Sequence, residues 1–272
     1  MPRDSEQAGM TDEQDSGSRP ANSLERILAV LGVFSERRLE WTPEELMEEL
    51  GYTRPTLYRY LKTLREAGLV TSLPNAGFTL GPRVVELDYF VRRSDPLIAA
   101  ATSHLTALAE LFECTSLVAR WYGDSILCID SEHSTAIQIS SYERGRPMSL
   151  GRGAIPRSIV AFLPRQRQLA VVRKHFDDMR SVGLGDDVEA IVSSLRRVRS
   201  EGYAVGYGEV TPGVVGVAAP IFDGGRSPIA SLCVTIAGHH VRAGTVEHIA
   251  AEIRTRAATI GEALQTGQSP AL

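Results

Sequence analysis

Polar and apolar positions alternate at helical spacing over two neighbouring segments, 42–51 and 53–66. In the first, Thr42 and Glu45 form a capping box around Pro43, which suits the first turn of a helix. Gly51 supplies the left-handed residue that can end it. The second segment follows Thr53, a further capping residue. Its apolar positions form one stripe: Leu57, Tyr60, Leu61 and Leu64. The pattern predicts two helices joined by a tight turn.

A strand, a turn and a second strand follow these helices directly. Residues 69–73 and 78–80 have strand character, and Pro74, Asn75 and Gly77 occupy the turn between them. Upstream, 23–34 has apolar residues three and four positions apart, which predicts a supporting helix. Its expected core stripe consists of Leu24, Ile27, Leu28, Leu31 and Phe34. Together these elements predict a winged helix-turn-helix domain over residues 22–82.

The second helix of the pair has a basic polar face. The run from Thr53 to Arg65 contains no acidic residue, whereas the preceding helix carries four glutamates. A helix in the major groove needs cations for phosphates and Arg, Thr or Tyr side chains for base edges. The candidate DNA-binding residues are Arg54, Thr56, Tyr58, Arg59, Lys62 and Arg65. A solvated basic face is the alternative, but the wing after the helix favours DNA binding.

The remainder of the chain predicts a linker helix over 83–95 and a larger α+β domain over 96–266. Asp95 and Pro96 close the linker. Gly123 and Asp124 form a hairpin turn. The expected strands are 115–121, 125–129, 136–142, 214–222 and 229–237. The expected helices are 97–112, 155–162, 165–175, 188–201 and 245–264.

Length, charge and cysteine content are consistent with two folded domains inside the cell. The chain has 272 residues and a net charge of −4, and much of the negative charge lies in the polar segment 1–21. We expect disordered tails at 1–21 and 267–272. Cys114, Cys128 and Cys233 have no CxxC spacing, which favours buried reduced thiols. No apolar run approaches the roughly 18 residues of a membrane helix, so a cytoplasmic location is expected.

Signals for catalysis or metal binding are missing from the sequence. There is no GxSxG, HExxH or GxxxxGK[ST] motif. His239 and His240 are adjacent, so in an extended strand they would point to opposite faces and could not easily share a metal. We therefore expect no cofactor, no metal site and no enzymatic activity. An enzyme or ligand-processing domain fused to a DNA-binding module remains the alternative.

Small residues gather over 207–220, YGEVTPGVVGVAAP, where they would leave room for a ligand against the backbone or allow close strand packing. Four motifs occur in order: SLERIL at 23–28, TLYRYLKTL at 56–64, AIPRSIVAFLP at 154–164, and RSEGYA at 199–204 leading to AAP at 218–220. Jointly they resemble the IclR family of bacterial transcriptional regulators over about residues 22–266.

The resemblance implies a second domain similar to the GAF fold that binds a small organic effector, commonly a carboxylic or aromatic acid. Carried over by position, the effector site consists of Leu150, Ala154, Ile155, Val214, Gly216, Cys233 and Thr235. Cys233 and Thr235 are two residues apart, so they share one face of a strand. Pro156 stands where many members of the family have Gly.

Three charged residues, Glu209, Arg120 and Arg146, are expected nearest to the effector, and an Arg would suit a carboxylate. Each also fits an exposed strand position. Since one recognition helix contacts few bases, we expect a homodimer or homotetramer on double-stranded operator DNA. Its operator affinity would respond to the effector through the linker helix. A winged helix used only for protein contacts is a third interpretation.

Overall fold

The computed structural model describes residues 22–134 and 142–267, and the chain divides into two compact units between Tyr89 and Phe90. The expected tail 1–21, nearly all of the tail 267–272 and nearly all of the strand expected at 136–142 lie outside the described residues.

The first unit is a winged helix-turn-helix, followed by a helix that crosses the division between the units. The elements of the winged helix-turn-helix are α1 (Ser23–Gly32), α2 (Pro43–Leu50), α3 (Arg54–Glu66), β1 (Val70–Ser72) and β2 (Phe78–Leu80), and the helix that follows is α4 (Pro82–Ser94). Both bonds of the capping box between Thr42 and Glu45 are present, and Gly51 ends α2 with a φ of 64°. Strands β1 and β2 pair as an antiparallel hairpin, which confirms the wing.

The predicted apolar stripe of α3 is buried in full, and it packs with Leu46, Trp41 and Phe78. The stripe predicted for α1 is partly wrong. Leu24 and Leu28 are 73% and 61% exposed, and Val30 is the residue of α1 that is fully buried. Ile27, Leu31 and Phe34 pack against the same core as Val30, so the buried face is centred nearer to Val30 than the prediction placed it.

The expected capping by Thr53 is also different in the structure. Thr53 occupies the N-cap position of α3 with an extended backbone, but its side chain caps no backbone N–H. Its hydroxyl donates instead to the hydroxyl of Thr56, at 3.0 Å. Since Pro55 has no N–H, the first turn of α3 has one backbone donor fewer that needs a capping acceptor.

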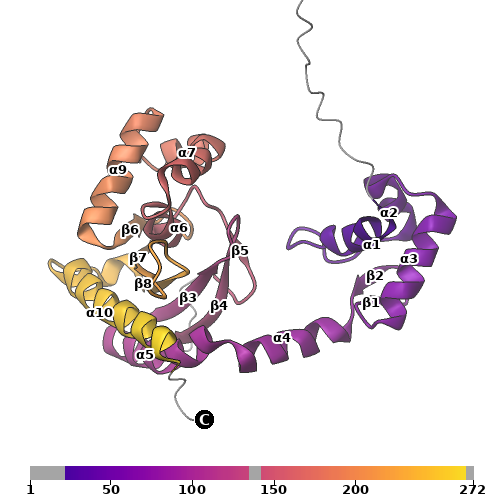
Figure 1. The fold of residues 1–272 in the computed structure, drawn as a ribbon, viewed down its shortest axis with the longest axis horizontal. Coiled ribbons are helices and arrows are strands. Elements are labelled where there is room, and N and C mark those ends of the chain that lie inside the picture. The colour runs from indigo at the N-terminus through magenta and orange to yellow at the C-terminus, as the bar shows by residue number, and fades with distance from the viewer. Residues whose placement is uncertain (1–21, 135–141, 268–272) are drawn as a thin grey trace, which may run out of the picture. The chain divides into compact units, whose positions relative to one another are not determined.

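The second unit is an antiparallel sheet with helices on both faces (Figure 1). Its strands are β3 (Thr115–Trp121), β4 (Ile126–His133), β5 (Pro147–Met148), β6 (Ala204–Tyr207), β7 (Val214–Ile221) and β8 (Ala230–Ala237). Its helices are α5 (Pro96–Phe112), α6 (Ala154–Val160), α7 (Arg165–Lys174), α8 (Phe176–Ser181), α9 (Val188–Glu201) and α10 (Thr245–Thr266), with a 3₁₀ turn η1 at Gly238–His240. The predicted α+β class is confirmed.

The strand order is β5-β4-β3-β8-β7-β6, and every pairing is antiparallel. Helices α5 and α10 cover one face, while α6 packs on the other and is backed by α9 (Figure 1). Along β8, Leu232 and Val234 belong to the core under α5 and α10, whereas Cys233 belongs to the core under α6. The alternation of the strand therefore assigns each residue to one of two cores.

Three short elements, β5, β6 and α8, were absent from the sequence prediction. Strand β6 is an edge strand, AVGY, that contains a glycine and ends at an exposed tyrosine. Helix α8, FDDMRS, buries only Met179. Elements this short carry too few apolar positions to show a period.

We predict that Gly261→Ala, in the middle of α10, lowers the unfolding midpoint of the protein, although alanine favours helices by about 1 kcal/mol. A Cβ at this position would overlap the carbonyl oxygen of Phe222, so the helix would have to move off the sheet. The matched control is Gly32→Ala at the end of α1, where a Cβ meets nothing within 4 Å. Thermal unfolding followed by circular dichroism compares the two, and an equal or higher midpoint for Gly261→Ala would contradict the close approach.

Candidate nucleic-acid interface and ligand cavity

The polar face of α3 is open to solvent. Of the six candidate DNA-binding residues, five are exposed and Thr56 is half-buried; the five are Arg54, Tyr58, Arg59, Lys62 and Arg65. The guanidinium of Arg54 lies 5.5 Å from the ring centre of Tyr58, so the two side chains at the start of the helix stack. Lys62 lies 3.8 Å from Glu66 in an exposed ion pair, which leaves it free to exchange this partner for a phosphate.

A small cavity lies where the start of α6 meets β7 and β8. Its volume is about 30 Å³, which is room for roughly two waters. It is lined by Tyr142, Gly153, Ala154, Ile155, Gly206, Glu209, Val210, Thr211, Val214, Gly216, Cys233 and Thr235. A ring-sized ligand would fit only after some of these side chains move.

Six of the seven residues expected at the effector site line this cavity, with Cys233 and Thr235 on the same face of β8. Leu150 does not line it. It is 6% exposed and packs in the core under α6. Tyr142, Val210 and Thr211 also line the cavity. Val210 and Thr211 belong to the run 207–220 expected to leave room for a ligand, and Tyr142 ends the strand expected at 136–142, but none of the three was chosen individually because no periodic pattern marks them.

A buried ion pair lies at the wall of the cavity, where Glu209 is a lining residue and Arg157 stands directly behind it. The guanidinium of Arg157, on α6, pairs with the carboxylate of Glu209, on the loop between β6 and β7. Their side chains are 10% and 11% exposed. Glu209 Oε2 also accepts a hydrogen bond from the backbone N–H of Gly153 at 2.9 Å. Arg157 Nε donates to the carbonyl oxygen of Gly153 at 3.0 Å. Glu209 was expected near the cavity; Arg157 was not singled out.

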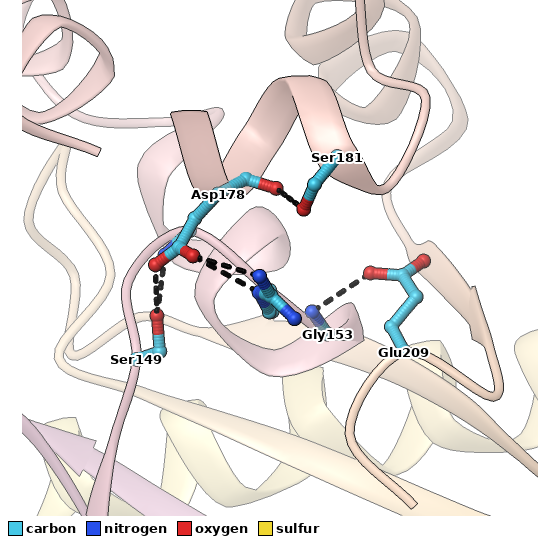
Figure 2. A network of polar contacts seen from close by, with 7 residues as sticks. Ser149, Gly153, Asp178, Ser181 and Glu209 are labelled. Atoms are coloured by element: carbon cyan, nitrogen blue, oxygen red, sulfur yellow. Dashed lines mark hydrogen bonds and ion pairs between the residues drawn. The ribbon is translucent and has the colours of Figure 1, made fainter. Parts of the chain in front are cut away.

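The loop before α6 is held from its other side by Asp178, on α8 (Figure 2). Asp178 accepts from Arg152 Nε at 3.0 Å and from the hydroxyl of Ser149 at 3.3 Å. A Cβ at Gly151 would overlap the side chain of Asp178, so only glycine allows this approach. Asp178 does not line the cavity.

Pro156 is accommodated without loss at the start of α6. It lies in the first turn, where a backbone N–H has no partner within the helix. The chain turns into the helix at Gly153, whose φ is 95°. A Cβ there would lie 3.1 Å from both the hydroxyl of Tyr142 and a methyl group of Val210. The glycine at 153, rather than one at 156, therefore shapes this wall.

Tyr142 brings a hydroxyl to the cavity. Burial raises the pKa of this phenol, and the nearby Cys233 and Glu209 raise it further. The hydroxyl is therefore protonated at neutral pH and can donate a hydrogen bond to an anionic ligand.

The other two charged candidates lie elsewhere. Arg120 pairs with Asp95 at 2.8 Å and, like Arg146, does not line the cavity. His239 and His240 lie in η1, and their rings pack edge to face with centres 4.3 Å apart, so the extended strand assumed for them is wrong. Among residues 22–134 and 142–267, no group of three or more His, Cys, Asp or Glu side chains could hold a metal ion.

Two protein-family models match this chain. Residues 23–74 match the IclR helix-turn-helix domain, and residues 90–262 match the bacterial transcriptional regulator IclR C-terminal domain. The chain belongs to the IclR family. It is thus a DNA-binding transcriptional regulator of this family.

One relative of known sequence and two of known structure illustrate what this chain is similar to. The HTH-type transcriptional regulator XynR of Escherichia coli is 27% identical over 78% of this chain and 85% of its own length. The crystal structure of an IclR transcriptional regulator from Alicyclobacillus acidocaldarius has a TM-score of 0.73 at 24% identity, over 89% of this chain and 98% of the other. An IclR homolog from Microbacterium hydrocarbonoxydans, complexed with 4-hydroxybenzoate, has a TM-score of 0.72 at 19% identity, over 90% of this chain and 100% of the other. The two structural likenesses show the fold alone.

Membrane-spanning helices are not found in the part of the chain that the structure describes, where every helix is too short or too polar to cross a bilayer.

We predict that the three cysteines of this IclR regulator resist alkylation in the native protein. Burial raises the pKa of Cys114 and Cys128 to about 12 and raises that of Cys233 as well, so the reactive thiolate is scarce near neutral pH. Labelling with a chromogenic disulfide reagent at about pH 8 should consume none of the thiols within minutes, and all three after denaturation. Rapid labelling of one thiol in the folded protein would show that its core opens.

Proposed function

We propose that this IclR regulator binds operator DNA through α3 and that a small organic acid in the cavity controls its affinity for that DNA. The observation that carries the proposal is the cavity itself, where small and apolar side chains surround a phenol hydroxyl and lie beside the buried guanidinium of Arg157. Such a site suits a carboxylate on a compact apolar or aromatic body. The 4-hydroxybenzoate complex of the Microbacterium homolog supports an aromatic acid as one such ligand.

DNA contact is assigned to the exposed face of α3. Arg54 and Arg59 lie in the first half of the helix, where side chains reach base edges, whereas Lys62 and Arg65 lie toward its end and suit phosphates. This division gives the two groups different roles, one in sequence reading and one in general affinity. A regulator with this role acts on DNA, which supports the cytoplasmic location expected from the sequence.

The signal between the sites is assigned to the linker helix α4. Near its C-terminal end, Arg92 pairs with the buried Asp130 of β4 at 3.5 Å. Just beyond it, Asp95 caps α5 and pairs with Arg120 of β3. A change in the sheet would therefore reach α4 through two ion pairs. Allosteric couplings are typically about 1–3 kcal/mol, or roughly 5–150-fold in operator affinity.

The assembly is proposed to be a homodimer or homotetramer. Helix α4 has no buried residue, and its exposed apolar side chains include Val85, Leu87 and Val91. Leu24 and Leu28, one turn apart on α1, are exposed as well. Apolar surface of this extent on helices indicates an interface, and a second copy of the chain would bring a second recognition helix to the operator.

No catalytic role is proposed. The family members to which the chain is related are transcriptional regulators. A measured turnover of a bound acid would instead support the fused-enzyme alternative.

The effector proposal is tested by fluorescence anisotropy on DNA from upstream of the protein's own gene, with shuffled DNA as the control, across a panel of aliphatic and aromatic monocarboxylates. At least one acid should change the affinity for the specific DNA and leave the affinity for shuffled DNA unchanged. If acids bind without moving operator affinity, the regulatory part of the proposal is wrong.

We predict that Arg54→Ala or Arg59→Ala weakens specific binding by about 1–3 kcal/mol, since each removes a base contact, and that Lys62→Ala lowers affinity on all sequences alike. Salt titrations of the anisotropy signal separate the two effects. Arg173→Ala, at an exposed position of α7, is the matched loss of charge outside α3. It should change neither the affinity for the specific DNA nor the affinity for shuffled DNA. Equal losses for all three α3 variants on both DNAs would refute the base-reading roles.

We predict that Leu87→Glu weakens self-association by about tenfold or more, because it places a charge in the proposed apolar interface of α4. Leu111→Glu, at an exposed leucine of α5, is the matched control and should leave the assembly unchanged. Sedimentation over a range of concentrations measures both variants. An unshifted assembly in Leu87→Glu would place the interface away from this part of α4.

A further inference from the structure

The side chain of Glu209 has the position and the contacts of a bound acid. It enters the cavity wall from the loop between β6 and β7, and one carboxylate oxygen accepts the Gly153 N–H while the other pairs with Arg157 (Figure 2 shows the contact with Gly153). A cation and a backbone N–H that converge on one carboxylate form a binding site for a carboxylate. In this chain, the site is filled by the protein itself.

Arg157 requires such a partner. Its side chain is 10% exposed, and an unpaired guanidinium at this depth would be strongly destabilising. Its position also depends on Gly206, because a Cβ there would lie 3.0 Å from the Nη2 atom of Arg157. The glycine lets the guanidinium reach the edge of the cavity, where Gly206 and Glu209 are both lining residues. A molecule in the cavity is therefore close to Arg157.

The segment that carries Glu209 is built to move. It runs between Gly208 and Gly213, which both have left-handed backbones, with φ of 64° and 75°. Both glycines are exposed, as are Val210 and Pro212. Two exposed glycines at its ends give the segment backbone freedom to swing outward, and an acid that takes the place of the Glu209 carboxylate on Arg157 removes the main contact that opposes this movement. Its displacement would also enlarge the cavity, since Glu209, Val210 and Thr211 form one of its walls.

We propose that Glu209 is an internal competitor for the effector, and that a carboxylic acid enters by displacing the Glu209 carboxylate from Arg157 and the Gly153 N–H. This inference rests on the proposed function. The exchange replaces one carboxylate by another, so it is nearly balanced in charge and hydrogen bonds. The net affinity then comes from the apolar body of the acid in the cavity. A neutral ligand that displaced Glu209 would leave Arg157 unpaired, so the site selects acids over their neutral amides.

The test is isothermal titration calorimetry of the full chain with benzoate and with benzamide, which has nearly the same shape and no charge. Glu209→Gln removes the competing charge but keeps an oxygen for the Gly153 N–H. We expect it to bind benzoate about tenfold or more tightly than the unsubstituted protein, with benzamide affinity changed by less than about twofold. Glu209→Asp keeps the charge on a shorter side chain, so its affinity for benzoate should lie between those of the unsubstituted protein and Glu209→Gln.

Asp178→Asn is the matched control. It removes a carboxylate that holds the same loop from outside the cavity, so the preference for benzoate should stay as in the unsubstituted protein. Circular dichroism checks that each variant is folded, and Glu209→Asp serves if Glu209→Gln is not. Unchanged or weaker benzoate binding in a folded Glu209→Gln, or in Glu209→Asp if that variant replaces it, would overturn the inference.

The two proposals fail in distinguishable ways. If acids bind and shift operator affinity while Glu209→Gln leaves the preference for acid over amide unchanged, only the competition is wrong. If neither the unsubstituted protein nor any variant binds benzoate or another monocarboxylate, both the competition and the acid effector are wrong, whereas DNA binding stands on its own measurement.

Discussion

The sheet of the second unit is covered by helices on both faces, and this constraint fixes almost everything else in the unit. Five of the seven residues of β3 and seven of the eight residues of β8 are buried, so each of these must suit one face of the sheet or the other. If the pairing of β8 slipped by one residue, every side chain of the strand would point to the opposite face. Cys233 would then leave the cavity wall for the core under α5 and α10, and Val234 would take its place. The paired neighbours on β3 and β7 hold this register along the whole strand.

The cavity follows from that register together with small side chains. Gly216 on β7 faces Thr235 on β8, and a Cβ at Gly216 would come within ordinary contact of Ala154 on α6. Small residues on both sides allow α6 to approach the sheet without filling the space completely. The same approach takes the guanidinium of Arg157 out of water, and its pairing with Glu209 offsets the cost.

Two carboxylates hold the loop before α6, and they differ in their surroundings. Asp178 lies 39% exposed outside the cavity, where its bonds to Ser149 and Arg152 fasten the loop to α8. Glu209 is 11% exposed and belongs to the cavity wall. The contacts of Asp178 therefore suit a permanent structural role, whereas the contacts of Glu209 lie where a ligand can compete with them.

The sequence by itself determined the local elements that have strong signals. The capping box at Thr42, the left-handed Gly51 and the apolar stripe of α3 predicted the helix-turn-helix, because caps and periodicity act within a few residues of one another. The alternation in β8 likewise placed Cys233 and Thr235 on one face. Family motifs indicated which segments form the cavity.

Tertiary structure alone decided the contacts between distant segments. Arg157 and Glu209 are 52 positions apart, and no local pattern marks either as a partner of the other. The exposure of Leu24 and Leu28, and the burial of Val30 instead, depended on how α1 meets α2 and α3. A sequence pattern gives the apolar band of a helix, but only packing against its neighbours selects the part of that band that is buried, since burial is a property of the surfaces that meet.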